Sequence, residues 1–222
     1  MRTDSEIQKD VMDEFRWEAL LNASEIGVAV KHGIVTLTGS VDTYTKKLAA
    51  ENAAKNVVGV KAVAENIDVK LTSYGKRNDT EIAEAVINAL KWHTAVKEDK
   101  VKIKVEDGWV SLEGEVEWEF QKTAARSTVE NLSGVVGITN NIKIKPQVGA
   151  TDLKKKISAA YHRNATIDAE KITLDVVGGK VTLRGKVRSY AEKKDAETAA
   201  WLAPGVDKVE NNLEIDTEVY AY

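Results

Sequence analysis

The 222-residue chain contains no cysteine, so it can form no disulfide, no thiolate metal site and no thiol nucleophile. It also has no apolar run long enough to span a bilayer. Its formal net charge of -3 gives no strong attraction, at the level of the whole chain, to nucleic acid or to an anionic membrane. The remaining composition, 43% hydrophobic and 30% charged, is typical of a globular protein.

The first residues, 1–7, contain no apolar stretch that resembles a signal peptide. From this we expect a cytoplasmic protein. A periplasmic location is the expectation if a signal peptide has been removed.

What the sequence does contain is an internal triplication. The pattern Gly-x-Val-x-Leu-x-Gly-x-Val occurs at residues 33–41, 108–116 and 179–187, and the residues around it keep the same register. Self-similarity at a fixed period indicates one structural unit used repeatedly. The sequence therefore predicts three domains at residues 3–71, 78–146 and 149–217, which we call the first, second and third repeats. Short turn-forming linkers join them, at residues 72–78 and 146–150.

Each repeat begins with a helix pattern. In the first repeat Ile7, Val11 and Phe15 recur at a four-residue spacing, which predicts one apolar stripe of an amphipathic helix. A hydroxyl residue stands just before this stripe in every repeat, and we expect it to be the N-cap. These residues are Ser5, Thr80 and Thr151.

Two strands follow, joined by a two-residue turn that ends in glycine. The alternation Ile26, Val28, Val30 predicts a half-buried strand, and the turn predicts a type I′ hairpin with positive φ at both positions. A second glycine lies inside the second strand, where a bulge or a close backbone approach is the expected reason. The two glycines of each repeat are Gly33 and Gly39, Gly108 and Gly114, and Gly179 and Gly185.

A second helix, rich in alanine, and a third strand complete each repeat. We expect Gly59, Gly134 and Gly205 to cap this helix at its C-terminus. The third strand of each repeat carries one asparagine, which we interpret as a lock on the local backbone rather than a ligand contact. The predicted fold is therefore α+β, with three αββαβ units, each a small three-stranded sheet against two helices. The three asparagines are Asn66, Asn141 and Asn212.

This pattern resembles the BON domain family (bacterial OsmY and nodulation). The resemblance rests on the glycine–valine string, the alanine-rich helix and the endings Gly-Val followed by Asn-Ile or Asn-Leu. It covers nearly the whole chain in three copies. It implies an αββαβ fold without catalysis, and a role in binding phospholipid surfaces or envelope components, often in osmotic or general stress.

No catalytic, cofactor or metal site is predicted from the residues themselves. His32, His93 and His162 occupy three different positions in the repeat, and no carboxylate cluster with metal-ligand spacing surrounds them. No phosphate-binding glycine loop, nucleophile elbow or carboxylate pair is present in the sequence. An enzyme is therefore the least expected class.

The repeats differ in charge on the outward face of the second strand. The row is nearly neutral in the first repeat, acidic in the second and basic in the third. Lysines on the adjoining strand can neutralise the acidic row, whereas the basic row has less compensation. The rows are Thr38, Ser40 and Asp42; Glu113, Glu115 and Glu117; and Arg184, Lys186 and Arg188.

Lysines on both predicted helices of the third repeat add to its basic row. We interpret them together as a surface that contacts lipid headgroups or an acidic partner. The alternatives are an ordinary solvated surface, and docking of the acidic row of the second repeat on the basic row within or between chains. The predicted contact residues are Lys154, Lys155, Lys156, Arg184, Lys186, Arg188, Lys193 and Lys194.

Aromatic residues differ between repeats as well. Trp17 and Trp92 share one position near the end of the first helix, and we expect both to pack against the core. Trp118 and Phe120 occur in the second repeat alone, and they are predicted contacts for a partner or a membrane.

The first function hypothesis is a non-enzymatic protein that binds phospholipid or envelope surfaces. The second is a protein-interaction or chaperone-like scaffold that uses sheet edges and aromatic residues. The third is capture of a small ligand or ion. No cofactor and no nucleic acid is expected, and sheet edges or complementary charged faces allow oligomers.

Overall fold

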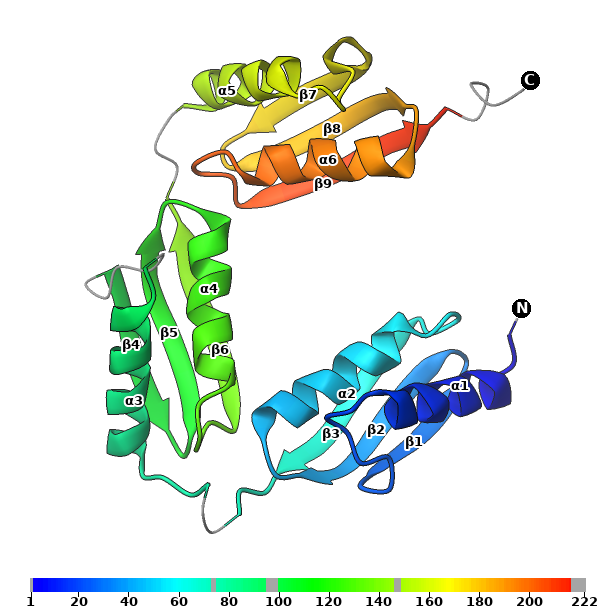
Figure 1. Ribbon diagram of the computed structural model, residues 1–222, viewed down its shortest axis with the longest axis vertical. Coiled ribbons are helices and arrows are strands. Elements are labelled where there is room, and N and C mark those ends of the chain that lie inside the picture. The colour runs from blue at the N-terminus through cyan, green and yellow to red at the C-terminus, as the bar shows by residue number, and fades with distance from the viewer. Residues whose placement is uncertain (1, 73–74, 95–99, 146–148, 217–222) are drawn as a thin grey trace. The chain divides into compact units, whose positions relative to one another are not determined.

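The computed structural model describes residues 2–72, 75–94, 100–145 and 149–216. The predicted order of helix, strand, strand, helix and strand is confirmed in all three repeats (Figure 1). The first repeat contains α1 (Asp4–Trp17), β1 (Ile26–Lys31), β2 (Ile34–Val41), α2 (Tyr44–Asn56) and β3 (Ala62–Val69). The second contains α3 (Asp79–Trp92), β4 (Val101–Glu106), β5 (Trp109–Val116), α4 (Glu119–Glu130) and β6 (Gly137–Ile144). The third contains α5 (Ala150–Arg163), a short 3-10 helix η2 (Ala169–Lys171), β7 (Ile172–Val177), β8 (Lys180–Val187), α6 (Tyr190–Trp201) and β9 (Lys208–Ile215).

Each repeat has its own three-stranded sheet, in the order β1-β2-β3, β4-β5-β6 and β7-β8-β9. In the first and third repeats the hairpin strands pair antiparallel, and the last strand pairs parallel with the central one. The parallel pair needs a crossover, and the second helix supplies it.

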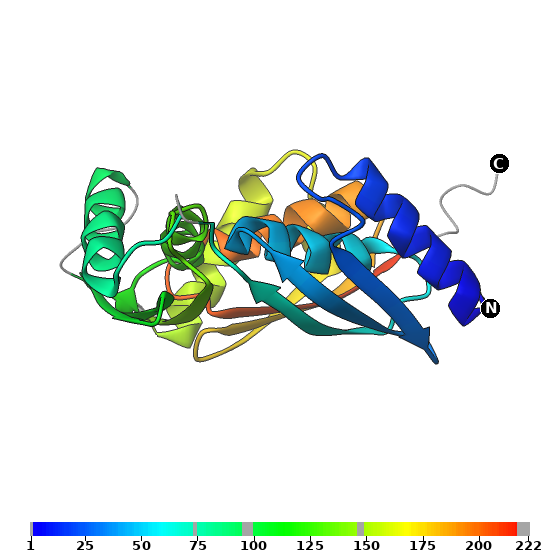
Figure 2. The same ribbon diagram turned by 90° about the horizontal axis from the view of Figure 1, so that it is seen from below.

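Both helices of the first repeat, and both of the third, cover one side of their sheet (Figures 1 and 2). Because strand side chains alternate, one residue in two faces the helices. In the third repeat Val181 and Leu183 of β8 join Leu153, Ile157 and Tyr161 of α5 in a buried core. The opposite face of these two sheets carries no helix of its own repeat. Arg184 and Lys186 of β8 lie on it, whereas Asp42 and Arg188, which follow the strands, contact α2 and α6.

The expected helix caps are shifted. The side chain of Thr3, not Ser5, caps α1 by accepting a hydrogen bond from the Glu6 backbone, and Glu6 bonds back to Thr3. Asn78, not Thr80, accepts from the Glu81 backbone at the start of α3, and Gly149 precedes α5. The predicted capping residues Ser5, Thr80 and Thr151 lie inside the helices. In the first two repeats a reciprocal side-chain cap stands two residues earlier, whereas Gly149 makes no side-chain cap hydrogen bond.

The hairpin turns match the prediction in two repeats. His32 and Gly33 have φ of 54° and 78°, and Asp107 and Gly108 have φ of 51° and 78°. In the third repeat Gly178 has positive φ (61°) but Gly179 does not, so the type I′ prediction is wrong there.

The glycine inside the second strand has the expected reason, a close backbone approach. A Cβ added to Gly185 would lie 2.0 Å from the Lys171 carbonyl oxygen, and one added to Gly39 would lie 2.1 Å from that of Glu25. Both glycines also have positive φ, 131° and 137°. Gly114 repeats this arrangement against Lys100, at 2.0 Å.

The third glycine of each repeat does not have the expected position. Gly59, Gly134 and Gly205 have positive φ, but they follow the ends of α2, α4 and α6 by three or four residues. The C-caps of α2 and α6 are Val57 and Leu202. These glycines therefore shape the connection after the helix rather than its cap.

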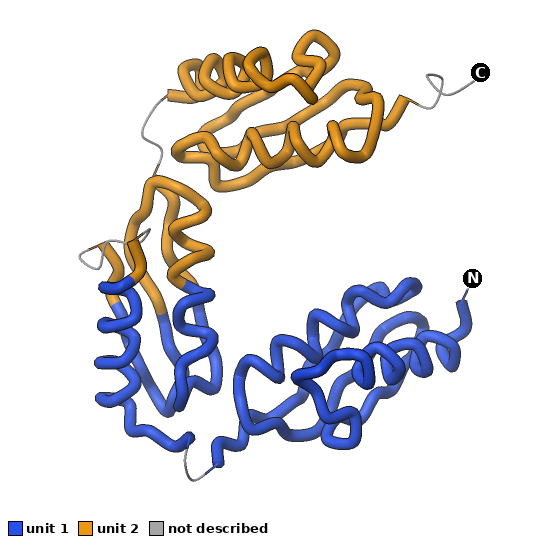
Figure 3. Tube along the Cα trace, in the orientation of Figure 1, with its two compact units in different colours: residues 1–92, 103–111, 126–139 blue, residues 93–102, 112–125, 140–222 orange. Residues whose placement is uncertain are grey.

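The chain forms two compact units, residues 1–92 with 103–111 and 126–139, and residues 93–102 with 112–125 and 140–222 (Figure 3). This division passes through the second repeat, so it does not follow the sheets. The domain boundaries stay a prediction from the sequence, and their ends at residues 146 and 217 lie outside the described residues, as does part of the linker 146–150.

Candidate anion-binding surface of the third repeat

Two residues of the basic row, Arg184 and Lys186, lie on the helix-free face of the third sheet, and acidic neighbours reduce their charge. Lys186 of β8 is paired with Glu214 of β9 in the strand register. Glu210, also on β9, forms ion pairs with Lys180 (2.7 Å) and Lys208 (3.2 Å). The third strand therefore supplies compensation that the two hairpin strands alone do not predict.

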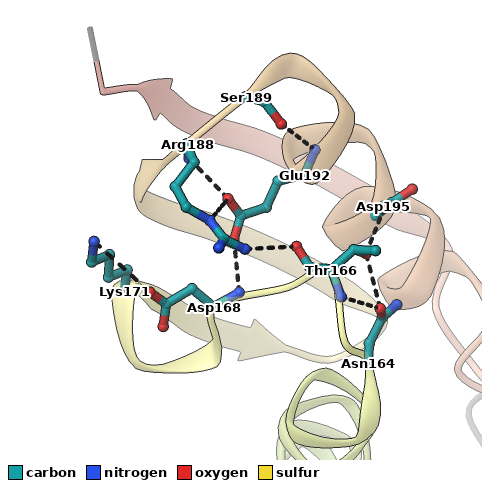
Figure 4. A network of polar contacts seen from close by, with 8 residues as sticks. All are labelled: Asn164, Thr166, Asp168, Lys171, Arg188, Ser189, Glu192 and Asp195. Atoms are coloured by element: carbon teal, nitrogen blue, oxygen red, sulfur yellow. Dashed lines mark hydrogen bonds and ion pairs between the residues drawn. The ribbon is translucent and has the colours of Figure 1, made fainter. Parts of the chain in front are cut away.

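Arg188 is engaged by a carboxylate of its own repeat, although about half of its side chain (51%) is exposed. Its guanidinium Nε lies 3.1 Å from Glu192 Oε2, and its Nη2 donates to the Thr166 carbonyl at 3.2 Å (Figure 4). Glu192 is only 3% exposed, and its two oxygens also accept from the Asp168 and Arg188 backbone N–H groups at 2.7 and 2.8 Å. The charge of Arg188 therefore holds a buried carboxylate, and its role as an external contact stays a prediction.

Burial by itself would raise the pKa of Glu192, but the hydrogen bonds outweigh it. The Asp168 and Arg188 backbone groups and the Arg188 guanidinium all favour the charged form, so the pKa lies below its ordinary value of 4.5. Glu192 therefore remains a carboxylate at neutral pH.

The same network fixes the loop between α5 and β7 to α6 (Figure 4). The Thr166 hydroxyl contacts Asp195 Oδ2 at 2.6 Å and Asn164 Oδ1 at 2.9 Å. Asp168 accepts a long ion pair from Lys171 at 3.8 Å. These contacts join the loop to the first half of α6.

Lys193 is also used internally. Its Nζ donates to the Leu213 carbonyl of β9, as Lys47 Nζ donates to the Ile67 carbonyl in the first repeat at 2.8 Å. Next to it, the side chain of Asn211 donates to the Lys193 carbonyl and accepts from the Leu213 backbone. The backbone lock thus comes from Asn211, whereas the predicted residue, Asn212, is exposed.

The other repeats show the same shift by one residue. Asn140 donates to the Lys122 carbonyl and accepts from the Ile142 backbone, whereas Asn141 is exposed. In the first repeat Glu65 accepts from the Ile67 backbone at 2.7 Å, and Asn66 is exposed.

Six of the eight predicted basic residues keep exposed cationic ends without a hydrogen bond or ion pair to any described residue. Arg184 and Lys186 are on the sheet face, and the other four are on helices that cover the opposite face. The residues on the helices are Lys154, Lys155, Lys156 and Lys194. The eight residues therefore do not form one surface.

The helix group has a feature that the sequence did not indicate, a groove between α5 and the end of α6. Its floor is formed by small or apolar side chains, and Lys156 and Arg163 stand on its α5 side. Tyr161 ties the two helices together beneath it, by donating from its hydroxyl to the Ala196 carbonyl at 2.7 Å. The groove is lined by Lys156, Ile157, Ala159, Ala160, Arg163, Asn164, Ala199, Leu202, Ala203 and Pro204.

The first helix of each repeat carries a different charge. α1 has five acidic and two basic residues, α3 has three and one, and α5 has one and four, so the formal net charges are -3, -2 and +3. The third repeat is therefore distinguished more by its first helix than by its sheet row.

In the second repeat the acidic row is largely paired. Lys100 lies 3.3 Å from Glu117, and Lys145 lies 3.3 Å from Glu115. The neutralisation predicted from Lys100, Lys102 and Lys104 is therefore confirmed for Lys100, whereas Lys104 pairs with Glu106 on its own strand at 2.8 Å.

The shared tryptophans contradict their predicted core role. Trp17 is 86% exposed and Trp92 is 85% exposed, each at the last residue of its helix. Trp118 and Phe120 contact each other at the start of α4, with ring centroids 6.0 Å apart, and Phe120 is 51% exposed. Exposed aromatic rings of this size are typical of contact surfaces.

The histidines are at three separate places, with His32 in the first hairpin turn, where its backbone N–H donates to Asp4 at 2.7 Å. Within residues 2–72, 75–94, 100–145 and 149–216, no three His, Asp or Glu side chains are grouped as a metal site would require. Over the same ranges, none of the helices has the length and apolar character needed to cross a bilayer.

Comparison with known proteins accounts for the repeated architecture. Three segments match the BON domain, at residues 3–70, 78–146 and 149–217, which is nearly the whole chain. The chain belongs to the BON domain family. The resemblance inferred from the glycine–valine string is thereby confirmed.

Among known proteins, this BON-domain chain is similar to osmotically-inducible protein Y of Escherichia coli (strain K12). The two are 28% identical over 129 residues, which are 56% of this chain and 64% of that protein. The match thus spans less than two thirds of the relative's length.

Among solved structures, the chain is similar to CdsD, a structural protein of the type III secretion system of Chlamydia trachomatis. The identity is 12% and the TM-score is 0.27, with 96% of this chain and 95% of that chain covered. The C-terminal domain of CdsD gives 12% and 0.26, with 97% and 98% covered. TM-scores this low support no inference about fold or function.

Proposed function

We propose that this protein is a non-enzymatic binding protein of tandem BON domains whose third repeat contacts anionic phospholipid headgroups. One observation carries the proposal. The first helix is acidic in two repeats and basic in the third, where Lys154, Lys155 and Lys156 are exposed and have no ion pair to any described residue. A surface of this kind is attracted to an anionic membrane even when the whole chain is slightly acidic.

The magnitude is sufficient for reversible binding. Each basic residue near an anionic membrane surface contributes on the order of 1 kcal/mol. Four exposed lysines on α5 and α6 would thus contribute about 4 kcal/mol, roughly a thousandfold in affinity. The attraction is screened within a Debye length of about 8 Å at physiological salt, so binding should weaken as salt is added.

The biological setting proposed is the osmotic stress response. It is supported by the name of the similar protein, osmotically-inducible protein Y, and by the shared BON family. A stress protein of this kind would act at a membrane or envelope surface without catalysing a reaction.

The test is co-sedimentation with vesicles that contain phosphatidylglycerol in phosphatidylcholine, with pure phosphatidylcholine as the neutral reference. K154E/K155E reverses two charges on α5, and R184E/K186E reverses two charges on the helix-free sheet face. The α5 variant should lose at least about thirtyfold in affinity, and the sheet variant should lose much less. Equal losses, or a larger loss in the sheet variant, would contradict the assignment to α5.

R184E/K186E is preferable to a variant that includes Arg188. Replacement of Arg188 would leave the buried Glu192 carboxylate without its guanidinium, so a loss of binding could reflect unfolding. Circular dichroism of both double variants should match that of the wild type.

A second candidate function is binding of another protein through the second repeat. Phe120 and Trp118 form an aromatic pair at the start of α4, with Phe120 half exposed. Aromatic anchors of this kind commonly contribute most of the binding energy of an interface. Trp118 fluorescence should shift when the partner binds, and vesicles alone should leave it unchanged.

A further inference from the structure

The first repeat has a groove at the same place as the groove of the third repeat, with the opposite character. It lies between α1 and the end of α2, and acidic side chains and a tryptophan stand on its α1 side. We call these two surfaces the first-repeat groove and the third-repeat groove. The first-repeat groove is lined by Arg2, Asp10, Asp13, Glu14, Trp17, Asn56, Val57 and Val58.

Four helix positions define the difference. The first-repeat groove has Asp10, Asp13, Glu14 and Trp17, and the equivalent positions of the third-repeat groove are Lys156, Ala159, Ala160 and Arg163. Their spacing of i, i+3, i+4 and i+7 forms one continuous flank of a helix, the arrangement that pairs helices side by side.

The two flanks are complementary in charge. The first-repeat groove carries three carboxylates and one guanidinium, a formal net charge of -2, and the third-repeat groove carries Lys156 and Arg163, a net charge of +2. Two of the carboxylates already have partners, since Asp10 pairs with Arg2 and Asp13 pairs with Arg16 at 2.6 Å. Both pairs are well exposed, so they are readily exchanged for other cations.

The flanks are also complementary in size. Trp17 projects from α1 with 86% of its surface exposed, next to Val58, which is 70% exposed. The third-repeat groove instead has two alanines on α5, and an apolar floor that includes Leu202, which is 63% exposed. A large ring placed against small side chains, with acids beside bases, matches the composition of an interface core and its rim.

From these observations we infer that the first-repeat groove of one molecule docks on the third-repeat groove of a second copy of this chain, with Trp17 as the anchor. The contact is heterologous, because it joins two different surfaces. Two such contacts close a dimer if the geometry allows a two-fold axis, and otherwise they continue into a chain of molecules. This inference does not rest on membrane binding. Lys156 belongs to both proposed surfaces, but Lys154 and Lys155, the two residues reversed in the membrane test, lie outside the groove.

The second repeat provides a matched control. Trp92 occupies the same helix position as Trp17 and is equally exposed, but the three acidic positions are replaced by Ala85, Asn88 and Ala89. A contact that needs only an exposed tryptophan would use both rings. A contact that needs acids and a tryptophan together would use Trp17 alone.

The experiment is sedimentation velocity of the full chain at low salt over a wide range of protein concentration. The wild type should self-associate, and added salt should weaken the association. W17A should weaken it about thirtyfold, as expected for an anchor residue, and W92A should leave it unchanged. A wild type that stays monomeric throughout, or equal effects of W17A and W92A, would overturn the inference.

Charge reversal makes the test specific for the two grooves. D13K/E14K makes both grooves of a molecule basic, and K156E/R163E makes both acidic, so neither variant should associate with itself. Mixed together, the two variants restore an acid–base match at each contact, and the mixture should associate. All four positions lie on the helix surface, so folding should be retained, and failure of the mixture to associate while both variants are folded would overturn the inference.

Discussion

The first and third repeats hold the same loop and helix together by opposite arrangements of charge. Where the third repeat pairs Arg188 before α6 with Glu192 on it, the first repeat pairs Asp42 before α2 with Lys46 on it at 2.8 Å. The acid on the helix reaches two backbone N–H groups as well as the guanidinium, which a lysine cannot do, because an ammonium group only donates. The fold therefore accepts either order of acid and base at these two positions, but only the Arg188–Glu192 pair of the third repeat belongs to a buried network.

At the hairpin turn it is the first repeat, not the third, that uses a carboxylate to bind two backbone N–H groups. In the first repeat Asp4 of α1 accepts from the His32 and Gly33 backbone N–H groups at 2.7 and 2.9 Å, and these hydrogen bonds lower the pKa of Asp4. In the second repeat Asp79 makes the equivalent pair of contacts, whereas the third repeat has Ala150 at this position. The third repeat thus has no acid at this position to clamp the turn, and the acid in the first turn of α5, Asp152, lies two residues later.

The largest predicted effect comes from removing Glu192. Glu192→Ala leaves two backbone donors and the Arg188 guanidinium without their acceptor, and it should lower the free energy of unfolding of the third repeat by about 2 to 4 kcal/mol. Lys46→Ala removes a half-buried pair that has a single contact, and it should cost less, about 1 kcal/mol. Amide hydrogen exchange, resolved by peptide, can follow each repeat separately. Equal losses of unfolding free energy in the two repeats would contradict a larger role for the buried pair than for the Asp42–Lys46 pair.

A smaller effect is expected from Tyr161→Phe. The first repeat has Phe15 at this position and needs no hydroxyl, whereas the Tyr161 hydroxyl donates to the Ala196 carbonyl. Loss of this buried hydrogen bond should cost about 1 kcal/mol, measured as faster amide exchange in α5 and α6. Unchanged exchange in both helices would show that the bond does not tie them together.

The stability of the third repeat should depend on pH through the titration of Glu192. Because the folded pKa of Glu192 lies below its ordinary value of 4.5, its stabilising contribution is fully present above that value. The contribution is lost as the pH falls through the folded pKa. The amide NMR signals of Asp168 and Arg188 should therefore titrate together with a midpoint below 4.5; a midpoint at or above that value would contradict the network.

Glu192→Gln provides the matched control for this titration. The second repeat has Gln121 at this position, which accepts from the Glu117 and Trp118 backbone groups at 3.0 and 3.2 Å. An amide can therefore replace part of the network without a titrating group. The variant should keep the fold, and the common acid transition of the two amide signals should be absent.

The sequence predicts the elements well because their patterns are local. Spacings of four residues and alternation along strands identify the helices and hairpins, and the glycine inside the second strand correctly indicates a close backbone approach. The helical period of about 3.6 residues also indicates that Trp17 is exposed. It lies two residues beyond the buried Phe15, about 200° around the helix, so it points away from the core.

The site is harder to predict because its contacts are not local. Whether Arg188 is free depends on a loop more than twenty residues away that presents the Thr166 carbonyl, and whether Lys193 is free depends on β9 lying beneath α6. The compensation of Lys186 depends on the register of the parallel pair β8–β9. None of these partners can be identified from the charges along one strand.

The central claim is that one repeat of the three, through its first helix, contacts the anionic surface. The most direct measurement is hydrogen–deuterium exchange of the full chain with and without phosphatidylglycerol vesicles. We predict protection of peptides from α5, with α1 and α3 unchanged. Equal protection of all three first helices, or protection of the β8 sheet face with α5 unchanged, would contradict the claim.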